Sequence, residues 1–249
     1  MTNKNQKRIH TSNLEILYQD QWIVVINKPE GLLSVPYSGC SQKTAINILE
    51  EMMRKKGLVN SKHHPFAVHR LDRDTSGVMM FALSRPIQQK MMNNWQKIVT
   101  ERLYRCISEI SKNADAEILS NHRGIICDEL AKNAHHIGFV PKNNDKAKNG
   151  RAFKTVEAKT HYHLIEKNEK FALFELELET GKKNQIRAHL SAHGFPIAGD
   201  IEHRAKTNPF SRLCLHARTL EFYHPQTGEK MKFEIPEPVE WSELCKNRK

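Results

Sequence analysis

Apolar and polar positions alternate over several short stretches of this 249-residue chain, and that pattern predicts β-strands. In residues 174–178, one phenylalanine and two leucines alternate with two glutamates, which is typical of a strand with one buried face. Residues 14–26 contain two such runs, which end at the turn-forming Pro29 and Gly31. Further strands are predicted at residues 78–83, 102–107, 213–217 and 231–235.

Three other stretches carry apolar side chains at intervals of three or four residues, the spacing of an amphipathic helix. They cover residues 45–53, 85–98 and 185–193. Ser84 can cap the second helix, and Gly194 can end the third. Residues 112–155 show no clear period and are left without an assignment. Strands and helices together predict a mixed α/β protein.

The charge balance favours a polyanionic partner. The chain has 39 lysines and arginines against 28 acidic residues, a net charge of +11. This excess suits RNA or DNA, because cationic side chains that neutralise phosphates release counterions. An anionic membrane surface fits less well, since no long basic amphipathic helix is visible. No apolar run approaches the roughly 20 residues of a membrane span, and the N-terminus lacks the apolar core of a signal peptide, so a cytoplasmic protein is expected.

Cysteines and histidines bear on metal binding. The five cysteines are scattered without a CxxC pair, which argues against a disulfide framework and a cysteine zinc site. The fourteen histidines leave a metal-dependent hydrolase open, because His189 and His193 are four residues apart on a predicted helix. Other candidate pairs are His63 with His64, His135 with His136, and His161 with His163. No HExxH motif accompanies them.

Residues 69–77, with the sequence HRLDRDTSG, form the most distinctive stretch of the chain. Two carboxylates and two guanidinium groups fall within five residues, followed by two hydroxyl side chains, a glycine and the apolar residues 78–83. A reactive group on a short loop that a rigid strand supports is what an active site needs. On charge pattern alone, a solvated turn whose charges neutralise one another is the simpler interpretation.

This stretch resembles the signature of the RluA family of pseudouridine synthases. Residues 27–32 (NKPEGL), residues 180–190 (TGKKNQIRAHL) and residues 194–200 (GFPIAGD) also resemble that family, in the expected order. The resemblance covers about residues 14–241. It implies an α/β protein of the α+β type, with a mixed, mostly antiparallel sheet, flanking helices and a central basic cleft. We expect a flexible basic tail at residues 1–13 and one catalytic domain at residues 14–245, without the N-terminal S4 RNA-binding domain of many relatives.

The resemblance also implies an activity, the isomerisation of uridine to pseudouridine in structured RNA, ribosomal or transfer. In the family, an aspartate at the place of Asp72 is catalytic, an arginine at the place of Arg187 pairs with it, and a tyrosine at the place of Tyr104 faces the target base. The uridine has to leave its stack to reach Asp72. The reaction needs no cofactor and no metal, and a monomer is the default expectation.

Four further residues are expected to bind the substrate. Arg70 resembles the family arginine that fills the space of the flipped base, and a salt bridge with Asp74 is the alternative for it. Lys28 and Lys182 are plausible phosphate contacts, although either could be an ordinary surface lysine. Ile186 lies within the motif that contains Arg187.

Some positions depart from the common family pattern. Asn184 stands where a histidine is usual, Lys182 where an arginine is usual, and His203 where a tyrosine often follows Gly-Asp. Val35 also replaces a frequent histidine. None of these is the aspartate, arginine or tyrosine of the expected site, so they bear on the choice of substrate rather than on activity.

Two alternatives concern RNA binding. Residues 142–159 carry six lysines and arginines against two acidic residues, a net charge of +4, and could be a loop or hairpin that grips RNA or a plain solvated loop. The whole chain could also be a noncatalytic RNA-binding or ribosome-assembly module on the same fold. The presence of Asp72, Tyr104 and Arg187 together favours the enzyme.

Overall fold

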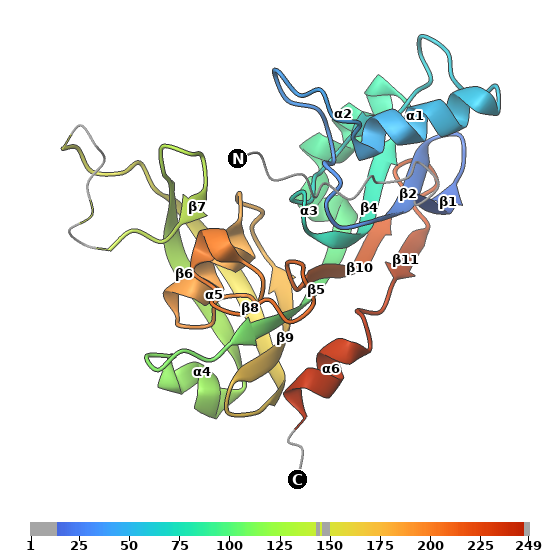
Figure 1. The fold of residues 1–249 in the computed structure, drawn as a ribbon. Helices are drawn as coiled ribbons and strands as arrows, with labels where there is room; N and C mark the ends of the chain where they lie inside the picture. Colours follow the sequence, from blue (N-terminus) through green and yellow to red (C-terminus); the bar gives the residue numbers. More distant parts are fainter. Residues whose placement is uncertain (1–13, 143–144, 146–149, 247–249) are drawn as a thin grey trace. The chain divides into compact units, whose positions relative to one another are not determined.

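The computed structural model describes residues 14–142, 145 and 150–246 (Figure 1). The expected basic tail of residues 1–13 lies outside them, as do residues 143–144 and 146–149 of the basic segment. Contacts within the chain divide it into two compact units. The first comprises Met1–Thr100 and Leu220–Ile235, and the second comprises Glu101–Thr219 and Pro236–Lys249. The single catalytic domain expected at residues 14–245 takes in both units and stays a prediction.

The first unit is built on antiparallel strands. Its elements are β1 (Glu15–Gln19), β2 (Ile23–Lys28), α1 (Ala45–Lys55), β3 (Phe66–Ala67), β4 (Ser76–Ala82), α2 (Arg85–Asn93), α3 (Trp95–Ile98) and β11 (Lys230–Glu234). Strand β2 pairs with β1 on one side and with β4 on the other, and β3 also pairs with β4. All seven residues of β4 are buried, so this strand gives the rigid support that the sequence predicted behind residues 69–77.

The predicted helix of residues 85–98 is interrupted. Ser84 takes the N-cap position of α2, but its side chain makes no cap hydrogen bond, so the predicted capping is only partly confirmed. Helix α2 ends at Asn93 and α3 begins at Trp95, because Asn94 between them has a φ of −119°. The Asn94 side chain donates a hydrogen bond to the Lys90 carbonyl (2.9 Å), a local bond that competes with the helix. Trp95 nevertheless packs against the same core as Met91, so the apolar stripe was predicted correctly.

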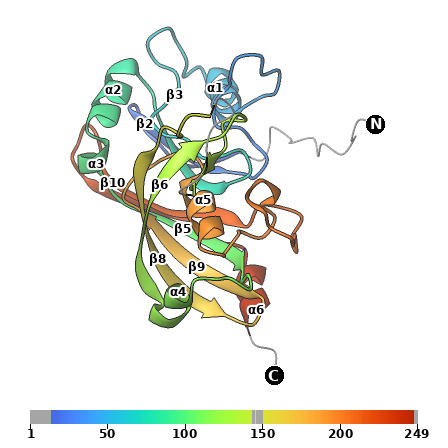
Figure 2. The ribbon, with the colours of Figure 1, turned by 90° about the vertical axis from the view of Figure 1, so that its left-hand side faces the viewer.

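The second unit contains a longer antiparallel sheet. Its strands are β5 (Val99–Glu109, which starts in the first unit), β6 (Arg123–Lys132), β7 (Gly138–Phe139), β8 (Val156–Lys167) and β9 (Phe171–Leu178). They follow the order β5-β9-β8-β6-β7, and Figure 2 shows β8 and β9 side by side. Strand β10 (Leu215–Tyr223) starts in this unit and ends in the first.

The helices of the second unit cover its sheet. They are α4 (Ala116–Asn121), α5 (Gln185–Ala192), the short 3₁₀ helix η2 (Ile201–His203) and α6 (Glu240–Cys245). Helix α5 packs against β6, β7 and β8 (Figure 1). Its Ile186 and Leu190 join a core cluster with Phe174 and Trp241. The expected α+β protein with a mostly antiparallel sheet and flanking helices is therefore confirmed. None of the described helices combines the length and the apolar character needed to cross a bilayer.

Candidate active site

Hydrogen bonds hold three alternate residues of the loop before β4, His69 through its side chain and Leu71 and Arg73 through their backbones. His69 accepts a hydrogen bond from the Met80 amide through Nε2 (3.0 Å). Ser34 holds Leu71 on both sides, because its hydroxyl donates to the Leu71 carbonyl (2.7 Å) and accepts from the Leu71 amide (3.1 Å). Each bond reaches a buried or partly buried element, so the loop is held against the first unit rather than solvated on all sides.

Lys28 holds the third of these loop residues, Arg73, through its backbone carbonyl. Its side chain is completely buried, and its ammonium donates to the carbonyls of Pro29 (2.8 Å), Leu32 (2.7 Å) and Arg73 (2.9 Å). A buried ammonium is tolerated only where its hydrogens are bonded. This position does not fit the phosphate contact expected of Lys28, and the structure instead gives the residue a supporting role beneath the loop.

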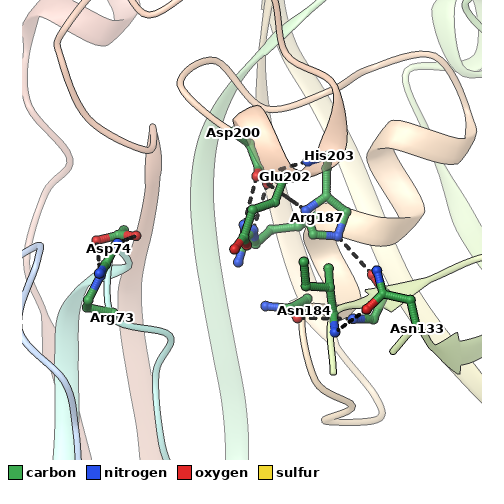
Figure 3. Close-up of polar contacts among 10 residues, drawn as sticks. Arg73, Asp74, Asn133, Asn184, Arg187, Asp200, Glu202 and His203 are labelled. Carbon is green, nitrogen blue, oxygen red and sulfur yellow. Dashed lines mark hydrogen bonds and ion pairs between the residues drawn. The ribbon is translucent and has the colours of Figure 1, made fainter. Parts of the chain in front are cut away.

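Asp72 lies between these fastenings and is partly exposed. The Thr75 amide donates to the Asp72 carbonyl (3.2 Å), which closes a tight turn directly after it. Arg73 pairs with the neighbouring Asp74 through Nε (2.9 Å) and Nη2 (3.1 Å) (Figure 3). Asp74 is thus bound to Arg73 and not to Arg70, whose side chain is exposed, so the alternative role of Arg70 as a salt-bridge partner of Asp74 is wrong.

Arg187 is held by two carboxylates of its own unit. Its Nε donates to Asp200 Oδ2 (2.6 Å), and its Nη2 donates to Asp200 Oδ1 (2.7 Å) and to Glu202 Oε2 (2.7 Å) (Figure 3). Burial alone would raise the pKa of Asp200, but hydrogen bonds from Arg187 and His203 outweigh it and lower that pKa to about 2. Asp200 is therefore ionised under ordinary conditions and fixes the plane of the guanidinium.

The turn before α5 is organised by one buried glutamine. Gln185 Oε1 accepts from the Thr180 hydroxyl (2.8 Å) and from the Lys182 amide (2.9 Å), and its Nε2 donates to the Lys159 carbonyl (2.9 Å). Lys182 itself is exposed, as a phosphate contact would have to be. Ile186, expected to contact the substrate, is only 4% exposed and belongs to the core cluster.

Tyr104 comes from β5, where it lies opposite Leu176 of β9. It is half-buried and packs against the core cluster that contains Ile186. One face of the sheet therefore carries the ring, and helix α5 contributes to the same cluster. Tyr104 and Arg187 thus belong to the second unit, whereas Asp72 belongs to the first, so their meeting at one site stays a prediction.

His189 and His193, the pair considered for a zinc hydrolase, contact other side chains. His193 lies between Asp115 (3.0 Å) and Asp128 (3.0 Å), one carboxylate on each ring nitrogen. His189 Nδ1 faces the Thr160 hydroxyl (2.9 Å). In the described part of the chain, the one group that could hold a metal is Asp200, Glu202 and His203. The Arg187 guanidinium binds both carboxylates of that group, so this cation already stands where a metal would have to bind.

Sequence reasoning missed the partners of Arg187. Asp200 was noted only as part of the stretch GFPIAGD, and Glu202 not at all. The available signal was the arginine itself, because a guanidinium in a predicted core-facing helix requires a carboxylate.

Comparison with known proteins agrees with these features. Residues 22–192 match the family model described as RNA pseudouridylate synthase. A Bacillus subtilis protein named as the uncharacterized RNA pseudouridine synthase YlyB is 33% identical over 241 residues, 94% of this chain and 73% of its own. The ribosomal large subunit pseudouridine synthase D of Pasteurella multocida is 29% identical over 248 residues, 93% of this chain and 69% of its own.

A solved structure shares the fold. Human RNA pseudouridylate synthase domain containing 4 superimposes with a TM-score of 0.69 at 22% identity, over 92% of this chain and 90% of its own. The family match contains residues 27–32, 69–77 and 180–190 of the stretches that resemble the RluA family, whereas residues 194–200 lie beyond it. The chain belongs to the RNA pseudouridylate synthase family and is by that membership an isomerase that acts on RNA.

Proposed function

We propose that this protein isomerises specific uridines of ribosomal RNA to pseudouridine, with Asp72 acting on a uridine that has rotated out of its stack. The observation that carries the proposal is the fastened loop, which fixes the backbone on both sides of Asp72 through Leu71 and Arg73. A preorganised loop keeps a reactive carboxylate in one place and so reduces the entropy lost on reaching the transition state.

The reaction sets three chemical demands. The bond between C1′ of the ribose and N1 of the base breaks, the base turns, and a bond forms between C1′ and C5. The proton on C5 then leaves to solvent, and N1 takes up a proton, so atoms and electrons balance without a redox partner. A carboxylate that attacks or stabilises the sugar or base, a surface that holds the detached uracil, and a group that removes the C5 proton suffice.

We assign these demands to three residues. Asp72 is the carboxylate. Arg187 is proposed to pair with it and favour its ionised form, supported by the Asp200 carboxylate that already orients the guanidinium. Tyr104 is proposed to lie against the uracil and to take the C5 proton, which a half-buried tyrosine between core and surface is suited to do.

Arg70 and Lys182 are proposed to hold the RNA. Both are exposed cations within the motifs of the site, and exposure is what a phosphate or base contact requires. Relatives that carry the name ribosomal large subunit pseudouridine synthase D support ribosomal rather than transfer RNA as the substrate. We propose that the protein acts as a monomer in the cytoplasm, where that substrate is found.

Tritium release from RNA labelled at uridine C5 tests the proposal. We expect the wild type to release tritium from ribosomal RNA, and Asp72→Asn to release none while binding RNA equally well. Asp74→Asn is the matched control, since Asp74 lies in the same loop and pairs with Arg73 at the surface; its release should be close to normal. Failure of the wild type to release tritium from ribosomal or transfer RNA, with RNA binding intact, would instead support a noncatalytic binding module.

A further inference from the structure

Both backbone polar groups of the buried Gly138 are bound by side chains that are distant in sequence but belong to the same unit. The Gly138 amide donates to Asn184 Oδ1 (3.1 Å), and the Gly138 carbonyl accepts from His203 Nε2 (2.8 Å). Gly138 opens β7, Asn184 precedes α5, and His203 closes η2. A Cβ at residue 138 would lie 2.2 Å from the Lys183 carbonyl oxygen, so only glycine allows this approach.

Asn184 adopts the geometry that the contact needs. It has a φ of 55°, in the left-handed region that asparagine tolerates better than most residues. An asparagine at a helix start ordinarily caps the helix, but here its side chain makes no cap hydrogen bond. The side-chain oxygen Oδ1 of Asn184 instead accepts a hydrogen bond from the backbone amide of Gly138.

His203 extends the contact to Arg187. Its Nδ1 faces Asp200 Oδ1 (3.2 Å), and Asp200 is the carboxylate that binds the guanidinium in bidentate fashion (Figure 3). Hydrogen bonds therefore run without interruption from the backbone of β7 through His203 and Asp200 to Arg187. Asn184 binds the first member of this path, Gly138, whereas His203 binds both Gly138 and Asp200, which allows the two side chains to be tested separately.

Apolar contacts hold Phe139 of β7, Val140 and Phe153 within the second unit. Phe139 packs edge to face on Phe153, with ring centroids 5.0 Å apart. Val140 packs against the small cluster that includes Ala188 of α5. The exposed cations Lys142, Arg151 and Lys154 lie just beyond these contacts.

We infer that Asn184 and His203 are positioning residues that clamp Gly138. The clamp sets the position from which the exposed Lys142, Arg151 and Lys154 reach RNA, and His203 also sets the orientation of Arg187 through Asp200. The inference rests on the proposed function, because its effect on turnover requires an RNA substrate. In this arrangement Asn184 acts on RNA binding through Gly138, whereas His203 acts on RNA binding through Nε2 and on the chemical step through Nδ1.

Isosteric variants separate these roles. Glutamine can place a donor where His203 Nε2 lies, and asparagine can place one where Nδ1 lies. His203→Gln keeps the bond to Gly138 and loses the bond to Asp200, so we expect kcat to fall with KM unchanged. His203→Asn does the reverse, and KM for RNA should rise about fivefold, the effect of one hydrogen bond, with kcat unchanged. Asn184→Gly keeps the positive φ without the acceptor and should behave like His203→Asn.

The experiment combines amide hydrogen exchange in the RNA-free full chain, followed by NMR, with steady-state kinetics of tritium release. Exchange of the Gly138 amide should become at least about fivefold faster in Asn184→Gly, while amides of β8 and β9 keep their rates. His135→Ala, an exposed change in the loop before β7, is the control and should leave both readouts unchanged.

The outcomes decide the inference in either direction. Unchanged exchange at Gly138 in Asn184→Gly, or KM and kcat that fall together in all three variants, would overturn it. If the wild type released no tritium, the proposed isomerisation would be wrong. The clamp would still be tested by two measurements on Asn184→Gly, the exchange rate of the Gly138 amide and the affinity for RNA.

Discussion

The ammonium of Lys28 donates a hydrogen bond to the backbone carbonyl of Arg73 (2.9 Å), and it joins the end of β2 to the loop that carries Asp72. Two more carbonyls, of Pro29 and Leu32, complete its bonding. Because the side chain is fully buried, this cation cannot be exchanged for water without opening the loop. Lys28 therefore supports the position of the proposed catalytic aspartate from inside the first unit.

Lys28→Met should destabilise the protein and reduce turnover. The change leaves buried carbonyls without donors, at a cost of about 1–3 kcal/mol each, so we expect a loss of about 3 kcal/mol in the free energy of unfolding. Turnover should fall at least about tenfold because the backbone around Asp72 is no longer fixed. Urea unfolding and tritium release measure the two effects.

Lys182→Met is the matched control for that variant. Lys182 is exposed, so its loss should leave the free energy of unfolding within about 0.5 kcal/mol of the wild type and weaken only the binding of RNA. If Lys28→Met unfolded like the wild type and lost only RNA affinity, the supporting role of Lys28 would be wrong and a phosphate contact would be the better interpretation.

The strands and the loop could be predicted because their signals are local. Residues 78–83 form an unbroken apolar run, and β4 is buried along its whole length, which is the pattern such a run predicts. The burial of Lys28 had no local signal, since a lysine before a proline resembles any surface lysine. Lys28 is buried because its ammonium binds the Arg73 carbonyl, and Arg73 lies 45 positions away in the sequence. A pattern read over a short stretch of sequence does not include both residues.

Residues 112–155 could not be assigned from the sequence because apolar and polar side chains occur together on the same faces of their strands. Strand β6 leaves Ile125 55% exposed, so apolar residues occur on both faces and the alternation is blurred. Strand β7 has only two residues and owes its existence to its pairing with β6 and to the bonds of Gly138 with Asn184 and His203. Such a strand has no sequence pattern of its own.

Arg187→Lys should behave as a severe change. A lysine cannot form the paired bonds from Nε and Nη2 to Asp200, so a buried carboxylate would be left partly unsatisfied. Breaking such a pair costs about 3–5 kcal/mol. We expect turnover to fall more than about a hundredfold and the melting temperature to fall as well. Calorimetry and tritium release provide the measurements.

Glu202→Gln is the comparison for Arg187→Lys. Glu202 also binds Arg187, but its side chain is 54% exposed, and exposed pairs contribute about 0–1 kcal/mol. Its substitution should therefore leave the melting temperature nearly unchanged. Full turnover in Arg187→Lys would exclude the proposed pairing of Arg187 with Asp72.

Tyr104→Phe should separate stacking from proton removal. Phenylalanine keeps the ring that packs against the core cluster and removes only the hydroxyl, so RNA affinity and stability should stay within about twofold and about 1 kcal/mol of the wild type. If the hydroxyl takes the C5 proton, tritium release should fall by about 10²–10⁴, the usual contribution of general base catalysis. Unchanged release would limit Tyr104 to holding the base.

Two histidines of the second unit should act on stability in opposite directions as the pH changes. Burial lowers the pKa of His189 to about 4, whereas hydrogen bonding to Asp128 and Asp115 raises the pKa of His193 despite burial. The folded protein thus resists protonation of His189 and favours protonation of His193. The stabilisation from neutral His189 is complete above pH 6.5 and is lost as the pH falls toward 4. That from charged His193 is complete below pH 6.5 and is lost as the pH rises through its raised pKa.

His189→Asn should remove the acid limb of this dependence. Asparagine keeps a polar atom near the Thr160 hydroxyl and does not titrate, so the variant should escape a loss on the order of 3 kcal/mol that the wild type suffers between pH 6.5 and 4. His193→Asn should instead flatten the curve above pH 6.5, because no imidazolium remains between Asp115 and Asp128. Urea unfolding at half-unit steps from pH 4 to 8 gives the three curves. Curves that run parallel across this range would mean that neither histidine changes its protonation on folding, and the buried, unpaired Nε2 of His189 would then need another explanation.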